Sequence, residues 1–210
     1  MIETFLYNNT SNNIVIPWSG GVDSTLIIFK VIKFFKKNVE QTKNLKIILV
    51  SGTQDVLNQH KQEKISREKI IKHIEKKYPS IFKQITLINF GESLLGYDAC
   101  NTETLHQPYF WITYLLGHYN KSTFLLGYHK GDDFWTILDK FQKVVDVSLE
   151  YLAREDTNIY YPLARMYKDE IYDELPNKVK KMVWYCESAN SIDILCDKCP
   201  SCITHNKFIK

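Results

Sequence analysis

Residues 14–25 are Ile-Val-Ile-Pro-Trp-Ser-Gly-Gly-Val-Asp-Ser-Thr, and this stretch decides the fold. An apolar run typical of a strand leads into the glycine pair, and the apolar run 26–35 that follows is typical of a helix. Two glycines at such a junction let the backbone turn tightly and approach a ligand closely. The N–H groups of the first helical turn would then face an anion, beside the hydroxyls of Ser24 and Thr25.

The alternative for this stretch is an ordinary turn in which the serines only cap the helix. Two glycines, an acid and two hydroxyls coincide at this strand–helix junction, which favours a phosphate site. No Gly-Lys-Ser/Thr follows at the spacing of a Walker loop, so a different kind of nucleotide loop is indicated.

The bulk properties indicate a folded protein. At 210 residues with 44% hydrophobic residues, the chain can bury one proper core. A net charge of +3 neither requires nor excludes a nucleic-acid partner. No apolar run approaches the roughly 20 residues that span a bilayer, and the start Met-Ile-Glu-Thr lacks the pattern of a secretory signal. We therefore expect a cytoplasmic protein with no membrane partner.

Strand-like and helix-like runs alternate along the chain, which predicts an α/β fold with a doubly wound parallel sheet. Residues 45–50 are apolar apart from Lys46, as expected for a strand covered on both faces. The charged stretch 60–77 carries isoleucines near helical spacing, which predicts an amphipathic helix on the sheet. The expected strands are 14–17, 45–50, 84–89 and 123–127, and the expected helices are 24–37, 60–77 and 105–118.

Four of the five cysteines lie near the carboxyl end with the spacing C-x9-C-x2-C-x2-C, which predicts a tetrahedral zinc site. Disulfides are less expected in a cytosolic protein, and the segment is too polar for a core, but an iron–sulfur cluster also uses four thiolates. We expect Cys100 to be unligated and His205 to lie at the surface. The predicted ligands are Cys186, Cys196, Cys199 and Cys202.

The Ser-Gly-Gly-x-Asp-Ser pattern resembles the signature of the PP-loop ATP pyrophosphatases. The resemblance implies that the chain binds ATP, adenylates an oxygen of its substrate and releases pyrophosphate. The residues expected to bind ATP are Ser19, Gly20, Gly21, Val22, Asp23, Ser24 and Thr25.

The loop and the cysteine segment together resemble the 7-cyano-7-deazaguanine synthase family, whose members make the nitrile precursor of queuosine. That family carries an aromatic-x-Cys before its Cys-x2-Cys-x2-Cys, as in residues 184–186 here. Weaker landmarks follow in the same order along the chain. They are His60 with Glu63, Gly127 with Asp132, and residues 161–163 with Lys168.

This resemblance implies an ATP-binding α/β domain over 1–180 and a four-cysteine zinc-binding segment over 181–210. In the implied reaction a carboxylate, that of 7-carboxy-7-deazaguanine, attacks the α-phosphate of ATP. Ammonia then displaces AMP to give an amide, and a second activation gives the nitrile. The cofactors are therefore ATP, Mg²⁺ and Zn²⁺, and a closed four-thiolate shell implies that the zinc is structural and away from the chemistry.

Donors and a cation must stabilise the departing pyrophosphate, so Asp23, Ser24 and Lys168 are the expected catalytic residues. Asp23 would help to hold Mg²⁺, which prefers carboxylate and phosphate oxygens. A lone lysine in a charged run is more often simply solvated, and this alternative stays open for Lys168.

Other residues are candidates for the acceptor pocket: His60, Glu63, Asp132 and Asp133. Asp132 and Asp133 also fit a loop turn after Gly131, and His60 and Glu63 also fit an exposed helix start. The aromatic residues of 109–111 and 134–135 could stack on a base, but core packing explains them equally well.

Two family segments near the acceptor are missing. Residues 106–111 replace a Val-Pro-Gly-Arg-Asn segment, and residues 132–136 replace a Ser-Gly-Tyr-Pro-Asp-Cys-Arg segment. We therefore expect an acceptor pocket that differs from that of a standard synthase. A diverged member, as in antiviral defence systems, would adenylate another acceptor, including a macromolecular one.

Two further alternatives remain open. A tRNA-modifying PP-loop enzyme of the thiolation type would need a catalytic cysteine, for which Cys100 is the candidate. A zinc-knuckle binding module without catalysis would show clustered Lys and Arg with stacking aromatics, whereas the lysines near the cysteines are scattered among acids. A nucleic-acid or protein acceptor is not indicated, small-molecule substrate and ammonia are the expected partners, and a homodimer is left open.

Overall fold

The computed structural model describes residues 2–7, 11–52, 58–90, 112, 115–153, 156–189, 191 and 193–207. The predicted helix 105–118 lies largely outside these ranges, although 112 and 115–118 are helical. Cys100 and the aromatic residues 109–111 also lie outside the described residues.

Within the described residues, five strands form one parallel sheet in the order β3-β2-β1-β4-β5. All four predicted strands are present, and the structure adds a fifth of three residues. This order is that of a doubly wound sheet, so the predicted fold class is confirmed. The strands are β1 (Asn13–Pro17), β2 (Lys46–Gly52), β3 (Ile85–Phe90), β4 (Ser122–Leu125) and β5 (Asn158–Tyr160).

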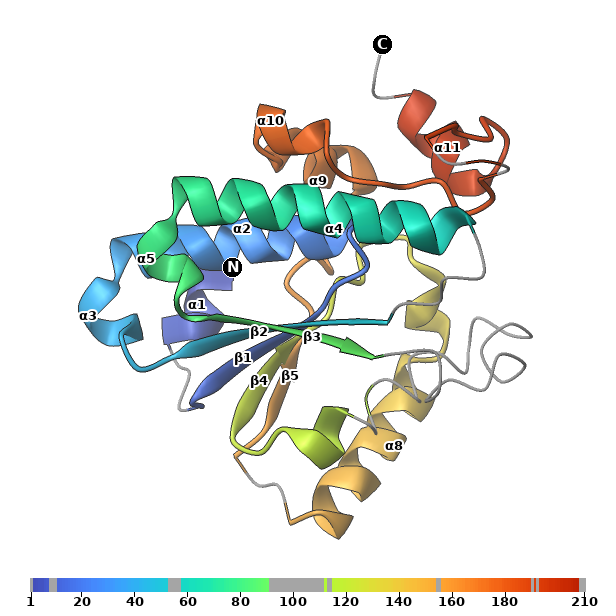
Figure 1. Ribbon diagram of the computed structural model, residues 1–210. Coiled ribbons are helices and arrows are strands. Elements are labelled where there is room, and N and C mark those ends of the chain that lie inside the picture. The colour runs from blue at the N-terminus through green and yellow to red at the C-terminus, as the bar shows by residue number, and fades with distance from the viewer. Residues whose placement is uncertain are drawn as a thin grey trace.

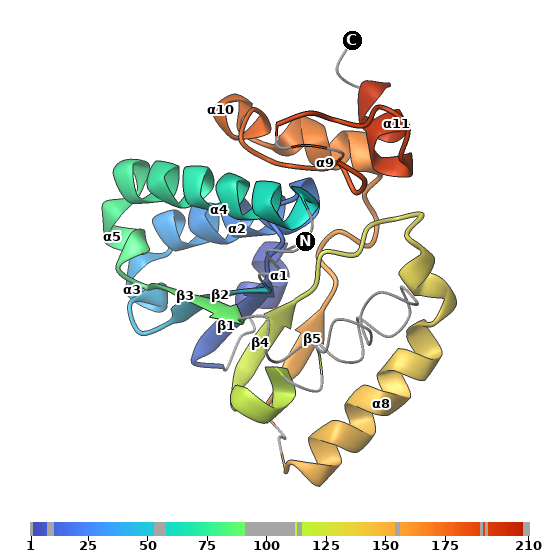
Figure 2. The same cartoon turned by 45° about the vertical axis from the view of Figure 1, so that its right-hand side comes forward.

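Helices cover both faces of the sheet (Figure 1). The two long helices α2 and α4 lie side by side on one face, and α8 lies on the other face, as Figure 2 shows from a second direction. The predicted helices 24–37 and 60–77 are confirmed as α2 and α4. The helices are α1 (Ile2–Tyr7), α2 (Val22–Lys37), α3 (Val39–Thr42), α4 (Asn58–Lys77), α5 (Pro79–Phe82), the 3-10 helix η2 (Asp133–Thr136), α8 (Leu138–Tyr151), α9 (Lys168–Glu174), α10 (Asn177–Lys180) and α11 (Pro200–Asn206).

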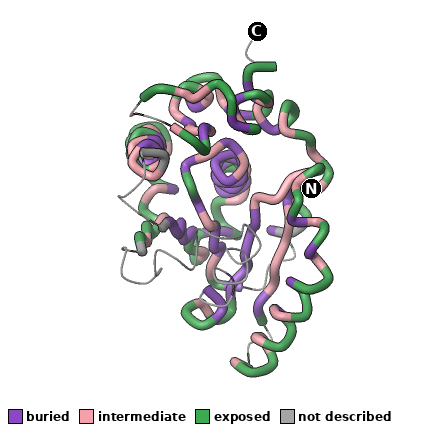
Figure 3. Tube along the Cα trace, turned by 90° about the vertical axis from the view of Figure 1, so that its right-hand side faces the viewer, coloured by how far each residue is buried: buried purple, intermediate pink, exposed green. Residues whose placement is uncertain are grey.

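Alternating side chains of the strands divide the core into two layers. Ile14 and Ile16 of β1 pack with α2, α4 and α9, whereas Val15 packs with residues of α8 on the opposite face. Both layers are nearly solvent-free, and Figure 3 shows the buried trace of the strands and of α2 within an exposed outer surface. Burial on both faces explains why these strands are continuously apolar.

The functional residues gather where the strand order reverses. The chain leaves β1 toward β2 on one side and β4 lies on the other, so a crevice is expected at the carboxyl ends of β1 and β4. The glycine loop of 19–21 follows β1, and residues 126–132 follow β4. None of the helices in the described ranges is both long and apolar enough to cross a membrane.

Candidate functional site

The glycine loop between β1 and α2 depends on Gly20. Gly20 has a φ of +94°, a conformation that residues with a side chain rarely adopt. A Cβ on Gly20 would also lie 2.8 Å from the backbone oxygen of Glu63, so α4 packs directly against the loop. Glycine at this position is therefore required both by the backbone conformation and by the close approach of α4.

Three donors bind the two carbonyl groups at this corner of the loop. Arg67 donates from Nη1 to the Ser19 carbonyl at 2.7 Å. The Gly20 carbonyl accepts from the Ser66 hydroxyl at 2.8 Å and from the Trp184 backbone N–H at 3.2 Å. Two of the donors come from α4 and one from the segment that leads into the cysteines.

Sequence reasoning missed Ser66 and Arg67, although one signal was available. Glu63, Ser66, Arg67, Ile70 and Ile74 share one stripe of α4 at helical spacing, and both isoleucines are buried. A serine and an arginine on the stripe that faces the core need buried polar partners. The loop carbonyls are those partners.

The start of α2 carries buried polar atoms that the rest of the described chain does not satisfy. Oδ1 of Asp23 and Oγ of Ser24 are buried and have no hydrogen-bond partner within the described residues. Gly21 stands at the N-cap of α2 and supplies no side-chain cap, so the first N–H groups of this helix gain no such partner. Unfilled donors and acceptors at one helix start fit a phosphate ligand with its cation.

The other two hydroxyls of the loop have structural contacts. Thr25 is fully buried, and its Oγ1 accepts from the Trp18 indole N–H at 3.1 Å. Ser19 Oγ accepts from the Gly21 backbone N–H at 3.2 Å. Of the three predicted hydroxyl ligands, Ser24 is thus the one whose oxygen has no partner among the described residues.

Lys168 reaches the loop from the first position of α9. Its Nζ forms an ion pair with Oδ2 of Asp23, and both side chains are largely buried. The structure therefore brings together the three residues predicted to be catalytic, from two elements that are far apart in the sequence. Lys168 is not a freely solvated lysine.

His205 is a correction to the sequence-based expectation of a surface residue. It is completely buried, stacked on Tyr185 with ring centroids 3.9 Å apart and edge-on to Tyr172. Burial, together with the positive charge of Lys168, lowers the pKa of His205 to about 4, against the opposite influence of Asp23. His205 is therefore uncharged at neutral pH and lies within electrostatic range of the Asp23–Lys168 pair.

The loop after β4 lies against the start of α2. A Cβ on Gly127 would be 3.4 Å from the Ser24 backbone nitrogen, so this glycine keeps the N–H group of Ser24 uncovered on that side. Asp132 is the N-cap of η2 and accepts from the Phe134 N–H at 3.0 Å, whereas Asp133 is exposed. Asp132 thus has the loop-turn role that the sequence left open.

Of the two predicted substrate residues on α4, Glu63 is the one whose pKa is shifted strongly. Burial raises the pKa of its carboxyl to about 7, although the nearby Arg67 acts in the opposite direction. Its backbone oxygen contacts the loop at Gly20, so Glu63 is not part of an exposed helix start. His60 lies one turn earlier on the same helix and is half-buried.

The aromatic residues 134–135 belong to the core. Phe134 is buried and stacks on Tyr128, with ring centroids 3.6 Å apart and the planes nearly parallel. Trp135 donates its indole N–H to the His129 carbonyl at 2.6 Å and contacts Tyr161 edge-on. Core packing, one of the two alternatives, accounts for both.

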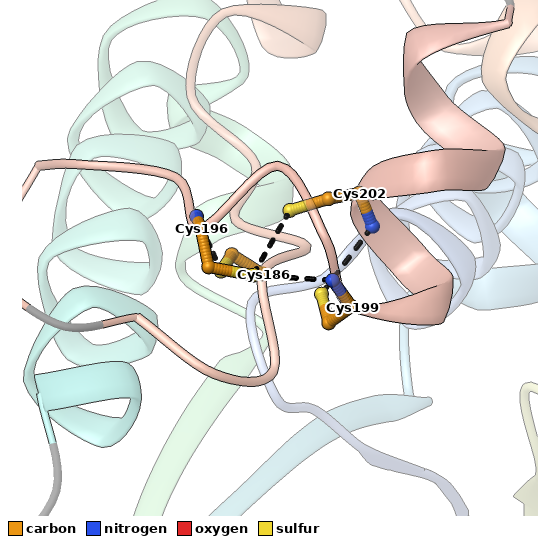
Figure 4. A group of neighbouring side chains, drawn as sticks. All are labelled: Cys186, Cys196, Cys199 and Cys202. Carbon is orange, nitrogen blue, oxygen red and sulfur yellow. Dashed lines mark hydrogen bonds between the residues drawn. The ribbon is translucent and has the colours of Figure 1, made fainter.

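The four predicted cysteine ligands converge on one point (Figure 4). Their sulfur atoms all lie within 4.8 Å of one another, and among the described residues they form a group able to hold a metal ion. Backbone N–H groups of Cys196, Cys199 and Cys202 donate to the sulfurs of Cys186, Cys196 and Cys199 at 3.3 to 3.4 Å. Such N–H···S bonds fix the sulfurs in place and favour their thiolate form, which is the form that binds metal.

The thiols differ in acidity. Burial raises the pKa of Cys202, whereas the backbone N–H of Lys198 lowers the pKa of Cys196 to about 6. A buried thiol of raised pKa must lose its proton before it binds a metal. Metal binding at this cluster is therefore coupled to proton release.

The segment that carries the cysteines contacts the glycine loop, while the expectation that a zinc ion takes no part in the chemistry stays a prediction. Trp184, which bonds the Gly20 carbonyl, is two residues before Cys186, and its indole N–H donates to the Cys186 carbonyl at 2.8 Å. Gln62 of α4 also donates to Asp193 at 3.1 Å, in the stretch between the first two cysteines. The cysteine segment and α4 thus both form hydrogen bonds to the loop carbonyls.

Comparison with known proteins gives a likeness to solved structures. No protein-family model matches the chain, and a search of curated proteins gives no match. Among solved structures, the chain is similar to the U34-tRNA thiolase NcsA from Methanococcus maripaludis with its [4Fe-4S] cluster. The TM-score is 0.53 at 12% identity, over 97% of this chain and 69% of that one. This likeness is one of fold. The chain has a parallel α/β fold similar to that structure, with a carboxyl-terminal group of four cysteines able to hold a metal ion.

Proposed function

We propose that the chain is an enzyme that uses ATP to adenylate its substrate and releases pyrophosphate at the loop of 19–25. One observation carries the proposal: Asp23 Oδ1 and Ser24 Oγ are buried without partners among the described residues, at a helix start with no side-chain cap and beside the cation of Lys168. Leaving buried polar atoms unpaired costs on the order of 1–3 kcal/mol each. A ligand with anionic oxygens and a cation removes that cost.

Each residue has a distinct role in this reaction. The N–H groups at the start of α2 and the Ser24 hydroxyl bind phosphate oxygens and stabilise the charge of the departing pyrophosphate. Asp23 has one oxygen paired with Lys168 and one without a partner in the described chain, so it can hold Mg²⁺ through the second. Once Asp23 binds the cation, the ammonium group of Lys168 is available to the phosphates.

For the acceptor, we place a carboxylate first, that of 7-carboxy-7-deazaguanine, with ammonia as the nitrogen donor. The support is the joint presence of the glycine loop and the cysteine segment in the order of that family. Glu63 stands at the loop with a pKa near neutrality, and a group of that pKa can take a proton from an attacking nucleophile. The missing family segments predict a pocket of different shape.

The second candidate is a tRNA-modifying enzyme. The likeness to a U34-tRNA thiolase over nearly the whole chain favours it specifically. In that case the adenylated atom would be a base oxygen, and the cysteine of the thiolation step would have to be supplied by Cys100, outside the described residues, or by the cluster itself.

For the metal, we propose one zinc ion bound by all four cysteines. Four sulfurs at about 2.3 Å from a tetrahedral zinc lie roughly 3.8 Å apart. The sulfurs of Cys196 and Cys202 are 3.9 Å apart, and all four lie within 4.8 Å. Thiolates that each bind a different iron of a four-iron cluster must surround the whole cluster, which requires a wider arrangement. The ion would hold the carboxyl-terminal segment in place and supply no chemistry to the substrate.

The test is pyrophosphate release by the purified chain with Mg²⁺ and ATP, comparing 7-carboxy-7-deazaguanine plus ammonia with unmodified tRNA. Pyrophosphate and AMP that appear with the first acceptor support the synthase-like reaction, and those that appear with tRNA support the second candidate. Orthophosphate as first product would contradict the assignment. Metal bound without turnover of either acceptor would favour a zinc-knuckle binding module.

A further inference from the structure

The carbonyl groups of Ser19 and Gly20, at the tight corner of the glycine loop, both accept hydrogen bonds from residues outside the loop. Ser66, Arg67 and the backbone of Trp184 supply three hydrogen bonds to the carbonyls of Ser19 and Gly20. A loop that binds an anion must present its N–H groups to the ligand and turn its carbonyls away, because a carbonyl oxygen repels phosphate. Donors that hold the carbonyls on the far side thereby fix the direction of the N–H groups.

We infer that Ser66 and Arg67 are positioning residues for the phosphates of ATP, acting through the loop carbonyls and not by contact with the nucleotide. Together with the Trp184 N–H they form what we call the carbonyl clamp. This inference rests on the proposed ATP-binding function of the loop.

The burial of Arg67 sets it apart from a structural surface arginine. Its side chain is only 6% exposed, its Nη2 has no hydrogen-bond partner within the described residues, and burial lowers its pKa. A buried guanidinium is costly; within the described residues Arg67 makes one hydrogen bond, to the Ser19 carbonyl, and the carboxylates of Glu63 and Glu68 partly offset the burial of its charge. Gly20 leaves room for it, since a Cβ there would lie 3.0 Å from Arg67 Cγ. Gly20 and Arg67 are therefore matched to each other.

The clamp also joins the loop to the metal cluster. Its third donor, the Trp184 N–H, precedes the first cysteine ligand by two residues, and Gln62 links the same helix α4 to Asp193. Ordering of the cysteine segment by metal would therefore support the clamp through Trp184, which donates to the same Gly20 carbonyl as Ser66 of α4.

The experiment compares binding of two ligands by calorimetric titration: a Mg²⁺ complex of an α,β-methylene ATP analogue, which cannot release pyrophosphate, and adenosine, which has no phosphates. The variants are Ser66→Ala, Arg67→Ala and Arg67→Lys. Lys69→Ala is the control, because it removes a positive charge from an exposed position of the same helix. Melting temperatures of all variants are measured alongside.

We expect Arg67→Ala to weaken binding of the ATP analogue by about tenfold or more and Ser66→Ala by about fivefold, while adenosine affinity changes less than about twofold. Arg67→Lys, which retains one N–H donor, should recover most of the loss, and Lys69→Ala should behave as the unmodified chain. Equal weakening for both ligands would show a merely structural role and overturn the inference, as would unchanged ATP affinity.

Two further outcomes are decisive. If Arg67→Ala does not fold, Ser66→Ala decides, because removing one hydroxyl leaves the packing of α4 intact. If the unmodified chain binds neither ligand, the proposed function itself fails, and the clamp with it. Binding by the unmodified chain with no selective loss in Ser66→Ala and Arg67→Ala rejects the clamp alone.

Discussion

The glycine loop of 19–21 and the cysteine cluster are joined by the Trp184 backbone, but their polar atoms are satisfied in opposite ways. At the loop, buried oxygens of Asp23 and Ser24 have no partner within the described residues, whereas at the cluster successive backbone N–H groups bond the cysteine sulfurs. The loop is held through its carbonyl groups, whereas the two oxygens at the start of α2 have no partner in the described part of the chain. At the cluster, the sulfurs of Cys186, Cys196 and Cys199 each accept a backbone N–H.

This difference distinguishes a site for an exchanging ligand from a site for a resident one. An exchanging ligand must find groups that are already oriented and not already paired. A resident ion can be held by a shell that closes completely around it. Trp184, which contacts the loop carbonyl and precedes the first cysteine, is where the two sites meet. The following predictions test how separate they are.

The largest expected effect is that of Asp23→Asn on pyrophosphate release. The change removes the negative charge that holds Mg²⁺ and pairs with Lys168, so we expect the rate to fall by at least about a hundredfold. The melting temperature should move only slightly. Asp139→Asn, an exposed acid of α8, is the control and should retain the rate of the unmodified chain. A rate that survives Asp23→Asn would mean that the unfilled oxygens do not serve catalysis.

Removal of the metal should affect both sites. We expect chelation, or Cys199→Ser, to lower stability by about 3 kcal/mol, because metal affinity adds to the stability of the segment that it orders. ATP affinity should fall by roughly tenfold through the Trp184 contact. Ile203→Ala, an exposed position on α11, should retain its metal and serve as control. Elemental analysis measures the metal content, calorimetry the stability and nucleotide titration the ATP affinity. Unchanged ATP affinity in the metal-free chain would show that the two sites are independent.

Features that depend on a local sequence pattern, such as the strands and the cysteine ligands, could be predicted from the sequence. The strands 14–17 and 45–50 were predictable because burial on both faces makes them continuously apolar. The cysteine ligands were predictable because metal binding imposes short spacings. Strand β5 was not predicted, because its three residues are all half-buried and form no apolar run.

The contacts between distant segments could not be predicted. His205 follows a polar cysteine segment, and its burial arises from Tyr172 and Tyr185, which no local pattern associates with it. The bond from Trp184 to the loop is between backbone groups, so no side chain in the sequence reports it. Long-range packing of this kind depends on how α9 to α11 lie over α2, which is a property of the whole fold.

Gly20→Ala sharpens the account of the loop. The alanine would have to adopt a φ near +94°, and its methyl group would lie too close to the Glu63 carbonyl oxygen. We therefore expect a loss of about 3 kcal/mol in stability and loss of most ATP binding. Gly131→Ala is a matched control, since Gly131 has a φ of +89° but no atom within 4 Å of a Cβ. It should cost about 1 kcal/mol, from backbone strain alone. Equal losses, measured by denaturant unfolding, would show that the approach of α4 is unimportant.

Glu63 should make the stability of the folded chain depend on pH. Its pKa is raised from 4.5 to about 7, so between these values the folded chain keeps a proton that the unfolded chain has lost. Stability therefore falls as the pH rises from 4.5 to 7 and levels off above. Glu63→Gln should flatten this slope and stabilise the chain by about 2 kcal/mol at pH 8. Unfolding free energies at several pH values test this, and an unchanged slope in Glu63→Gln would assign it to other groups.

The smallest expected effect concerns the loop after β4. Asp132→Ala removes the cap of η2 and should cost about 1 kcal/mol, while Asp133→Ala should change stability by less than about 0.5 kcal/mol. Neither change should alter ATP affinity, because the structure gives Asp132 a capping role and leaves Asp133 exposed. A clear loss of acceptor binding in Asp133→Ala would support its predicted role as a substrate residue.

The parallel pairing of β1 with β4 has a consequence for how the protein is made. Asn13 and Ser122 contact each other across 109 residues, and Asp23 meets Lys168 across 145. At 5–20 residues per second, a ribosome needs between about 7 and 30 s to add those 145 residues. During that interval the nascent chain carries its glycine loop without the lysine and without the Trp184 support. The pairing of Asp23 with Lys168 can therefore form only after residue 168 has been added.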